Sequence, residues 1–215
     1  MKFSVDIIQS DNEITNTILE KIRDHLQKAV NKSQPNIQQQ LSKILKDALT
    51  AQPEYQSLSS GKLRTELGVP NISMVNSIID QWINSTTIDS KKLRITNNQI
   101  FGGFSISMIK SDYADVLSMA DATIIDRNTG SNVPWLYWLL LGGGDILVNN
   151  YFVKTVGPTP RSRTGQTLMI KSDQKNWRMP PEFAGVAGNN WVYRAMDTIQ
   201  DKIEGMMQIE LEKHI

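Results

Sequence analysis

The stretch "KLRITNNQIFGGFSISMIK", residues 92 to 110, decides the fold class of this 215-residue chain. Its apolar residues alternate with polar ones, as they do in a half-buried strand, and the pairs Asn97–Asn98 and Gly102–Gly103 have turn chemistry. The alternating apolar positions are Leu93 and Ile95, then Phe104, Ile106 and Met108. We therefore expect one or two antiparallel strands here, immediately after a first part of the chain that has a helical period.

That helical first part contains several amphipathic segments. Residues 14–30 repeat isoleucine, leucine and valine at helical spacing, with acids early and lysines late, which suits the helix dipole. A break at Ser33-Gln34-Pro35 precedes a second helical pattern through Leu49, so a helical hairpin or a bent helix is expected. A short helix that Gly68 ends, and a third amphipathic helix from Ser73, complete this part.

The chain after residue 110 predicts more strands and then a final helix. Residues 122–133, 145–156 and 166–171 have strand and turn patterns, and residues 190–214 return to the helical period, with Asn189 or Asn190 as the cap. Because strands and helices are segregated along the chain, the sequence predicts an α+β fold. We expect a single domain, 1–215, with N-terminal helices (1–87), a central antiparallel β-sheet (88–189) and a long C-terminal helix (190–215) packed on the sheet.

Composition limits the functions that this chain can have. It is 40% hydrophobic and 21% charged with net charge +1, unlike a disordered or a dedicated nucleic-acid-binding chain. It contains no cysteine, which excludes disulfides, thiolate nucleophiles and Cys-ligated zinc. The first residues, "MKFSVDIIQSDNE", lack the apolar core of a secretory signal. We expect an intracellular protein whose electrostatic interactions are local.

The most hydrophobic stretch is "PWLYWLLLGGGD", residues 134 to 145, which holds seven consecutive apolar residues and two of the five tryptophans. It is about half of the ~20 residues that a membrane-spanning helix needs, so no membrane contact is expected. Its glycines lack the Lys-Ser/Thr of a phosphate-binding loop, so no cofactor is expected either. We interpret Gly142 to Gly144 as a helix end with positive φ before a sharp turn.

Catalytic patterns are not recognisable. The chain has two histidines, His25 and His214, and neither has sequence neighbours that suggest a site. Its 22 acids permit many spatial carboxylate pairs, so a hydrolase with an unrecognised carboxylate site remains a weaker hypothesis. We expect that the protein is not an enzyme and that it binds no metal.

A basic stretch follows the aromatic segment. No acid occurs between Asp145 and Asp173, whereas Lys154, Arg161, Arg163 and Lys171 lie there. Its centre, "GPTPRSRTG", reads as an exposed loop. Three interpretations stay open: a solvated loop, a docking arm for an acidic face on a neighbouring subunit, or a phosphate contact.

Three segments occur in an order that resembles the tail-completion or neck proteins of tailed bacteriophages, and in particular virion proteins of myovirus-like phages. They are "SGKLRTELG", "PWLYWLLLGGG" and "PPEFAGVAGNNWVYRAMDTIQ". Gly61, Leu63 and Arg64 match the first element and residues 134–144 match the second. Phe183, Arg194 and Ala195 match the third.

The resemblance implies a virion structural protein of the neck or head-proximal tail. Such proteins form a homo-oligomeric ring that joins head to tail, contact neighbouring neck, connector or tail proteins, and leave a channel through which DNA passes without specific binding. The implied location is the virion, with assembly in the host cytoplasm. A tail terminator that caps the tail tube is the alternative in the same class.

The expected subunit-interface residues are Trp135, Tyr137, Trp138, Lys154, Arg161 and Arg163. One small subunit cannot hide all three rings of the aromatic segment if they point to several sides, so the surplus is expected at an interface. The competing interpretation places both tryptophans in the core. A nucleic-acid-binding module that uses residues 154–178, with Tyr151, Phe152 and Trp177 as stacking rings, is the alternative from another class.

Overall fold

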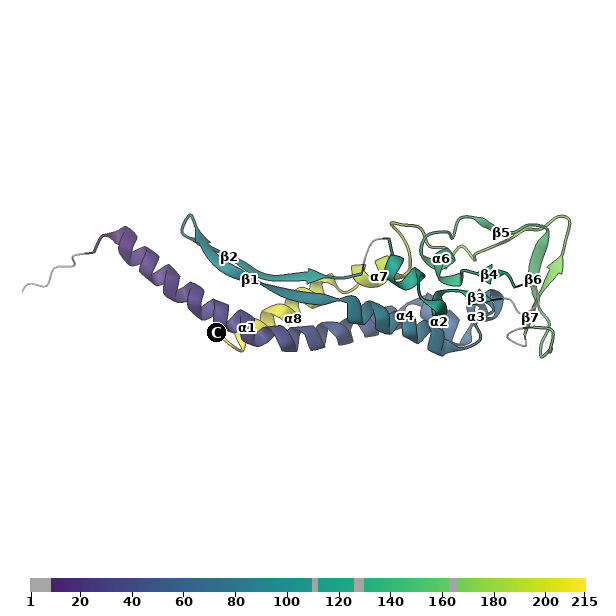
Figure 1. Ribbon diagram of the computed structural model, residues 1–215, viewed down its shortest axis with the longest axis horizontal. Coiled ribbons are helices and arrows are strands. Elements are labelled where there is room, and N and C mark those ends of the chain that lie inside the picture. The colour runs from purple at the N-terminus through teal and green to yellow at the C-terminus, as the bar shows by residue number, and fades with distance from the viewer. Residues whose placement is uncertain (1–8, 110–111, 126–129, 163–165) are drawn as a thin grey trace, which may run out of the picture. The chain divides into compact units, whose positions relative to one another are not determined.

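The computed structural model describes residues 9–109, 112–125, 130–162 and 166–215, and it has a mixed α+β fold (Figure 1). The chain forms two compact units. Unit 1 comprises residues 1–41, 87–107 and 202–215, and unit 2 comprises residues 42–86 and 108–201. Each unit is thus assembled from segments that lie far apart in the sequence.

Unit 1 contains most of α1 (Asp11–Ala51), the hairpin β1 (Thr87–Thr96) and β2 (Gln99–Ser107), and α8 (Gln200–Glu212). Helix α1 is continuous and has Pro35 inside it, so a helical hairpin at this point is wrong. Ser33 donates its hydroxyl to the Ala29 and Val30 carbonyl oxygens in the turn before the proline. Helix α1 thus continues past Pro35, although proline has no backbone N–H to donate.

The hairpin confirms the strands predicted for residues 92–110. Asn97 and Asn98 both have positive φ, 50° and 57°, as the two-residue turn of a tight hairpin requires. Gly102 and Gly103 are not a turn. They lie within β2, with φ of 133° and 120°, beside a register shift between Lys91 and Arg94. These glycines instead allow the strand to pass a bulge.

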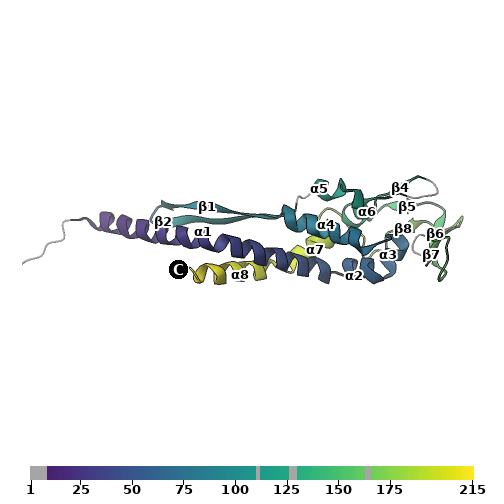
Figure 2. The ribbon, with the colours of Figure 1, turned by 60° about the horizontal axis from the view of Figure 1, so that its bottom comes forward.

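Helix α8 lies along α1 in unit 1, and Figure 2 shows α8 and the hairpin on different sides of α1. Asn36 and Gln40 of α1 donate hydrogen bonds to the Glu210 carboxylate at 2.9 and 3.0 Å. This carboxylate is buried and also accepts from Lys213 at 2.6 Å. Glu210 therefore joins α8 to α1.

Unit 2 contains the remaining elements, most of them short. Its helices are α2 (Pro53–Ser60), α3 (Lys62–Leu67), α4 (Ile72–Ser85), α5 (Ala114–Leu117), η1 (Ala120–Ala122), α6 (Trp135–Leu140) and α7 (Trp191–Asp197). Its strands are β3 (Ile124–Ile125), β4 (Asn132–Val133), β5 (Ile146–Val148), β6 (Tyr151–Thr155), β7 (Thr167–Lys171) and β8 (Trp177–Arg178).

The strands of the described residues form separate antiparallel pairs, β1–β2, β3–β4, β5–β8 and β6–β7, so the predicted central sheet is wrong. The C-terminal helical period is also divided between α7 and α8. Thr198 donates its hydroxyl to the Ala195 carbonyl, and the Ile199 amide bonds three residues back to Met196. Both bonds tighten the chain into a turn and end α7.

Tryptophans organise the core of unit 2. Trp82 and Trp191 meet edge to face with ring centroids 5.5 Å apart, and the Trp191 indole N–H donates to the Leu49 carbonyl at 2.9 Å. Trp82, Trp135 and Trp191 are all completely buried. Asn190 caps α7 by accepting from the Tyr193 amide, as the sequence predicts for one of two asparagines. These large rings thus form the interior, and the indole N–H groups of Trp135 and Trp191 donate to backbone carbonyl oxygens.

Candidate interaction surface

Helix α6 presents its aromatic residues to different environments. Trp135, Leu136, Leu139 and Leu140 are fully buried, and the Trp135 indole N–H donates to the Asp121 carbonyl at 2.8 Å. Trp135 is thus a core residue with a satisfied indole, and it offers no free surface as an apolar anchor. Tyr137 is 41% exposed and remains available to a partner.

The exposure of Trp138 is intermediate between that of Trp135 and that of Tyr137. Its ring meets that of Trp177, on β8, edge to face at 6.0 Å, and the Trp138 side chain is half-buried. Trp177 itself is 8% exposed. Trp138 therefore covers part of the unit and leaves part of its own ring at the surface.

The glycines after α6 serve close packing. None of Gly142, Gly143 and Gly144 has positive φ, so the expected left-handed helix end is wrong. A Cβ on Gly142 would lie 2.4 Å from the Tyr137 ring, and one on Gly143 would lie 2.4 Å from the Gly185 amide nitrogen. The Gly143 amide donates to the Gly185 carbonyl at 3.0 Å. Residues 142–145 form what we call the glycine turn, and its backbone is packed directly against residues 184–185.

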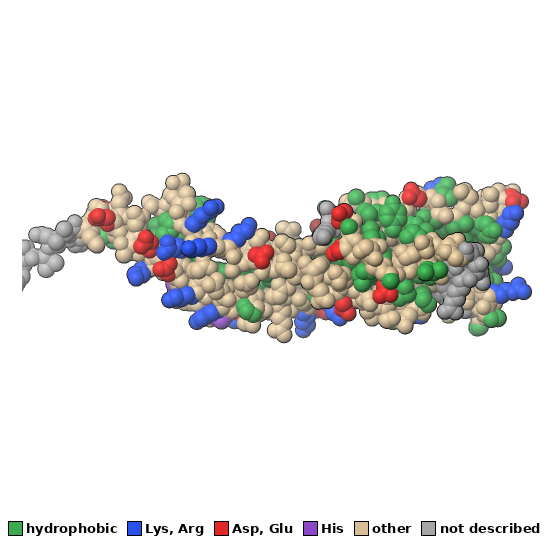
Figure 3. All heavy atoms as spheres, viewed as in Figure 1, with side chains coloured by type: hydrophobic (Ala, Val, Ile, Leu, Met, Phe, Trp, Pro, Cys, Tyr) green, Lys and Arg blue, Asp and Glu red, His purple; other side chains and the backbone are tan. Residues whose placement is uncertain are grey.

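Three exposed hydrophobic side chains flank this glycine turn. Tyr137 lies over Gly142, Ile146 begins β5 directly after the turn, and Val186 follows Gly185. Ile146 is 41% exposed and Val186 is 48% exposed. We call these residues the α6 surface, and Figure 3 shows hydrophobic side chains gathered over this part of unit 2. Exposed apolar side chains that gather in one place mark a candidate protein–protein contact.

The basic stretch forms the hairpin β6–β7, which we call the basic hairpin. Lys154 and Lys171 are exposed on its strands, and Arg161 is exposed in the connecting loop. Arg163 lies outside the described residues. Thr167 fixes the hairpin to α3 by donating its hydroxyl to the Thr65 carbonyl at 2.6 Å. Within the described ranges, Lys154 and Arg161 form no ion pair, so their charges are available to an acidic partner.

The five predicted interface residues that the structure describes therefore divide into two groups. Trp135, Tyr137 and Trp138 share α6, whereas Lys154 and Arg161 belong to the basic hairpin. No hydrogen bond or ring contact described for this chain joins the two groups. Unit 2 consequently offers an apolar surface and a basic hairpin as separate features.

The rings suggested for nucleic-acid stacking are largely occupied. Trp177 is buried against Trp138, and the Lys175 ammonium lies 4.8 Å from the centroid of the Phe152 ring. Stacking needs an open ring face. For catalysis, the described residues contain no group of three or more His, Asp or Glu side chains that could hold a metal ion.

The residues that carry the phage resemblance all lie in unit 2. Arg64 donates to the carbonyl oxygens of Ser59, Val69 and Pro70 at 3.1, 3.3 and 2.8 Å, and so ties α3 to its flanking segments. Leu63 is fully buried, and a Cβ on Gly61 would lie 2.8 Å from the Ser57 Cα. The Gly-x-Leu-Arg segment thus holds α3 close to the end of α2 and to the residues that follow α3.

Arg194 forms an ion pair that the sequence analysis missed. It bonds to the Glu54 carboxylate of α2 and to the Asn189 side chain at 2.6 Å. Glu54 is 1% exposed, and burial lowers the pKa of the Arg194 guanidinium. A glutamate just after a proline reads as an ordinary first-turn acid, so the sequence contains no signal for its burial.

No known protein family matches this chain, and neither the curated proteins nor the solved structures include one that is similar to it. None of the helices in the described residues is both long and apolar enough to cross a membrane.

Proposed function

We propose that this chain is a structural protein of a tailed-phage virion, placed in the neck or at the head-proximal end of the tail. Repeated copies close a ring around a channel for DNA, and the contacts between copies are heterologous. The observation that carries the proposal is the α6 surface, which exposes Tyr137, Ile146 and Val186 around a turn held by backbone packing. The ordered resemblance of three sequence segments supplies the phage context.

The basic hairpin supports an assembly role in a second way. Lys154 and Arg161 are exposed and unpaired within the described residues, and the hairpin is anchored to α3 through Thr167. An anchored arm with free cations suits docking onto an acidic face of a neighbouring subunit. In this proposal the α6 surface supplies affinity and the basic hairpin supplies orientation.

The test is self-association of the purified chain, measured by sedimentation velocity over a range of concentrations and by negative-stain electron microscopy. We expect concentration-dependent oligomers that include rings. Tyr137→Ser combined with Ile146→Ser should weaken association by about 2 kcal/mol, roughly thirtyfold, because both changes remove exposed apolar contact area. Far-UV circular dichroism should show that the variant remains folded.

Tyr193→Ser is the matched control, since Tyr193 is 56% exposed on α7 and lies outside the α6 surface. It should associate as the wild type does. A strict monomer that is also absent from purified virions would contradict the proposal. Unchanged association of the Lys154→Ala, Arg161→Ala variant, together with salt-dependent DNA affinity that this variant loses, would instead favour the nucleic-acid-binding module.

A further inference from the structure

Glutamines of α1 bond to the outer edge of β1 at Ile88 and Leu93 in unit 1. Strand β1 pairs with β2 on one side, and side chains of α1 bond to its other edge. Gln34 donates to the Ile88 carbonyl at 2.8 Å, and Gln38 accepts from the Ile88 amide at 3.1 Å. Gln27 accepts from the Leu93 amide at 2.7 Å. Side chains thus occupy edge positions that otherwise remain open to another strand.

Near the hairpin turn, the glutamines of α1 no longer bond to the outward backbone groups of β1. With Asn97 and Asn98 as a two-residue loop, Thr96 and Gln99 form the hydrogen-bonded closing pair. Ile95 and Ile100 are then a non-hydrogen-bonded pair, whose N–H and C=O groups point away from the partner strand. No residue that the structure describes bonds to the outward groups of Ile95. The edge of β1 at Ile95 is therefore open.

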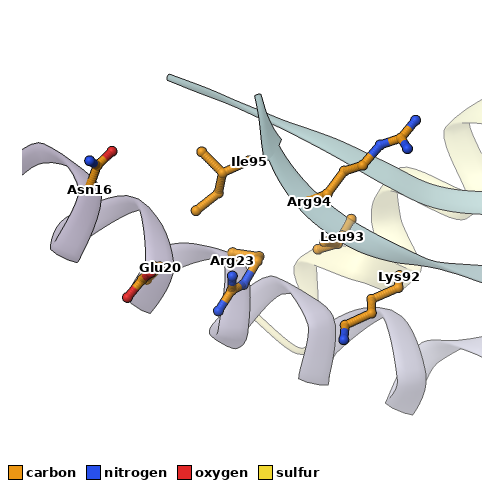
Figure 4. Close-up of a pocket in the computed structure, with 7 residues that line it drawn as sticks. All are labelled: Asn16, Glu20, Arg23, Lys92, Leu93, Arg94 and Ile95. Atoms are coloured by element: carbon orange, nitrogen blue, oxygen red, sulfur yellow. The ribbon is translucent and has the colours of Figure 1, made fainter. Parts of the chain in front are cut away.

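Ile95, at the open edge, is one of the residues that line a cleft of about 650 Å³. Asn16, Glu20 and Arg23 of α1 line one side, and residues 92–95 of β1 line the other. Figure 4 shows the Ile95 side chain on the α1 side of the strand and the Arg94 guanidinium pointing away from α1. An added strand at this edge would alternate between the same two faces.

The charges of the cleft indicate the chemistry of its occupant. Arg23 is paired with Asp24 at 2.7 Å, whereas Lys92 and Arg94 have no ion pair among the described residues. Glu20 is the single acid in the lining. A strand beside β1 would place an acidic side chain next to Arg94 and an apolar one next to Ile95.

We propose that the open edge of β1 binds an extended peptide segment of a partner protein, in which acidic and apolar residues alternate, by β-strand addition. Main-chain hydrogen bonds to Ile95 provide affinity, while Lys92, Arg94 and the apolar side chain of Ile95 select the sequence. This site lies in unit 1, and it requires neither the α6 surface nor a phage context.

The probe is a fluorescein-labelled, end-capped seven-residue peptide of alternating valine and glutamate, titrated with the full chain and followed by fluorescence anisotropy. We expect saturable binding in the micromolar range. A peptide with lysine in place of glutamate should bind at least about tenfold more weakly, because its charges oppose Lys92 and Arg94. A peptide N-methylated at its valines should lose binding because it lacks the required backbone donors.

Two proline variants form a matched pair. Ile95→Pro removes the outward N–H of β1, and Ile100→Pro removes the equivalent N–H on the opposite edge of the hairpin. Both keep the bonds between β1 and β2, since neither amide takes part in them. We expect Ile95→Pro to weaken peptide binding at least about tenfold and Ile100→Pro to change it less than about twofold, with unchanged circular dichroism for both.

Equal effects of the two proline variants, or no binding of the valine–glutamate peptide at millimolar concentration, would overturn the proposal. So would competition for the peptide by a single-stranded oligonucleotide, which would make the cleft a general anion site. Self-association that Ile95→Pro abolishes would show that a second copy of this chain occupies the edge. Failed peptide binding, equal proline effects or competition by an oligonucleotide leave the ring proposal unaffected, because that proposal is tested by variants in unit 2. Self-association that Ile95→Pro abolishes would instead contradict the assignment of the contact between copies to the α6 surface.

Discussion

Gly185→Ala should destabilise unit 2 strongly, because the added methyl group meets backbone and not a movable side chain. An ideal Cβ at this position would lie 1.7 Å from the Leu139 carbonyl oxygen and 2.4 Å from its carbonyl carbon. Overpacking of this kind costs about 1–3 kcal/mol. The displacement also threatens the hydrogen bond from the Gly143 amide to the Gly185 carbonyl, which contributes about 1 kcal/mol.

The expected loss is therefore about 3 kcal/mol in the free energy of unfolding. With a urea m-value of about 2 kcal/mol/M, the unfolding midpoint should fall by roughly 1.5 M. All five tryptophans of the chain lie in unit 2, so tryptophan fluorescence reports the unfolding of that unit alone.

Gly188→Ala is the matched control, since no atom lies within 4 Å of its ideal Cβ and its φ is not positive. This variant should stay within about 0.5 kcal/mol of the wild type. If Gly185→Ala unfolded at the wild-type midpoint, the close approach of the 184–185 backbone to α6 would be refuted, and with it the rigid support of the α6 surface.

Two further predictions concern α8. Gly205→Ala should stabilise unit 1 by roughly 0.5–1 kcal/mol, because Gly205 lies inside the helix with nothing near its ideal Cβ, and urea unfolding followed by far-UV circular dichroism would detect this gain or contradict it. Hydrogen bonds from Lys213, Asn36 and Gln40 lower the pKa of Glu210 from 4.5 to about 2. A carboxyl group with a lowered pKa stabilises the folded state above pH 4.5, and this contribution is lost as the pH falls toward 2. Glu210→Gln should therefore show a weaker acid dependence of stability than the wild type between pH 4.5 and 2, and identical acid profiles would argue against the α1–α8 contact.

Local patterns were sufficient for several elements. Helical periodicity places Val75, Ile78, Ile79, Trp82 and Ile83 on one side of a helix; the first four are buried on α4 (Ile72–Ser85), and Ile83 is half-buried. The β1–β2 hairpin follows from alternation and from the Asn97–Asn98 turn, since asparagine adopts positive φ readily. In each case the information lies within about a dozen consecutive residues.

Sequence reasoning failed where partners come from distant segments. The aromatic segment could not reveal that Trp135 bonds to the Asp121 carbonyl and is buried while Tyr137 stays exposed. The glycine turn was interpreted by φ preference, but Gly143 is held by the backbone of Gly185, more than forty residues later. The single central sheet was likewise predicted from the number of strand-like segments, and that number does not reveal which strands pair with one another.

The sequence by itself therefore determined the α+β class, the positions of α4 and of the β1–β2 hairpin, and the absence of cysteine chemistry. Only the tertiary structure decided the division into two units, the buried Glu54–Arg194 ion pair, the α6 surface and the open edge of β1. The physical reason is the range of the interactions involved. Periodicity and turn preference act between near neighbours, whereas burial, ion pairing and strand edges depend on which distant segments the folded chain brings together.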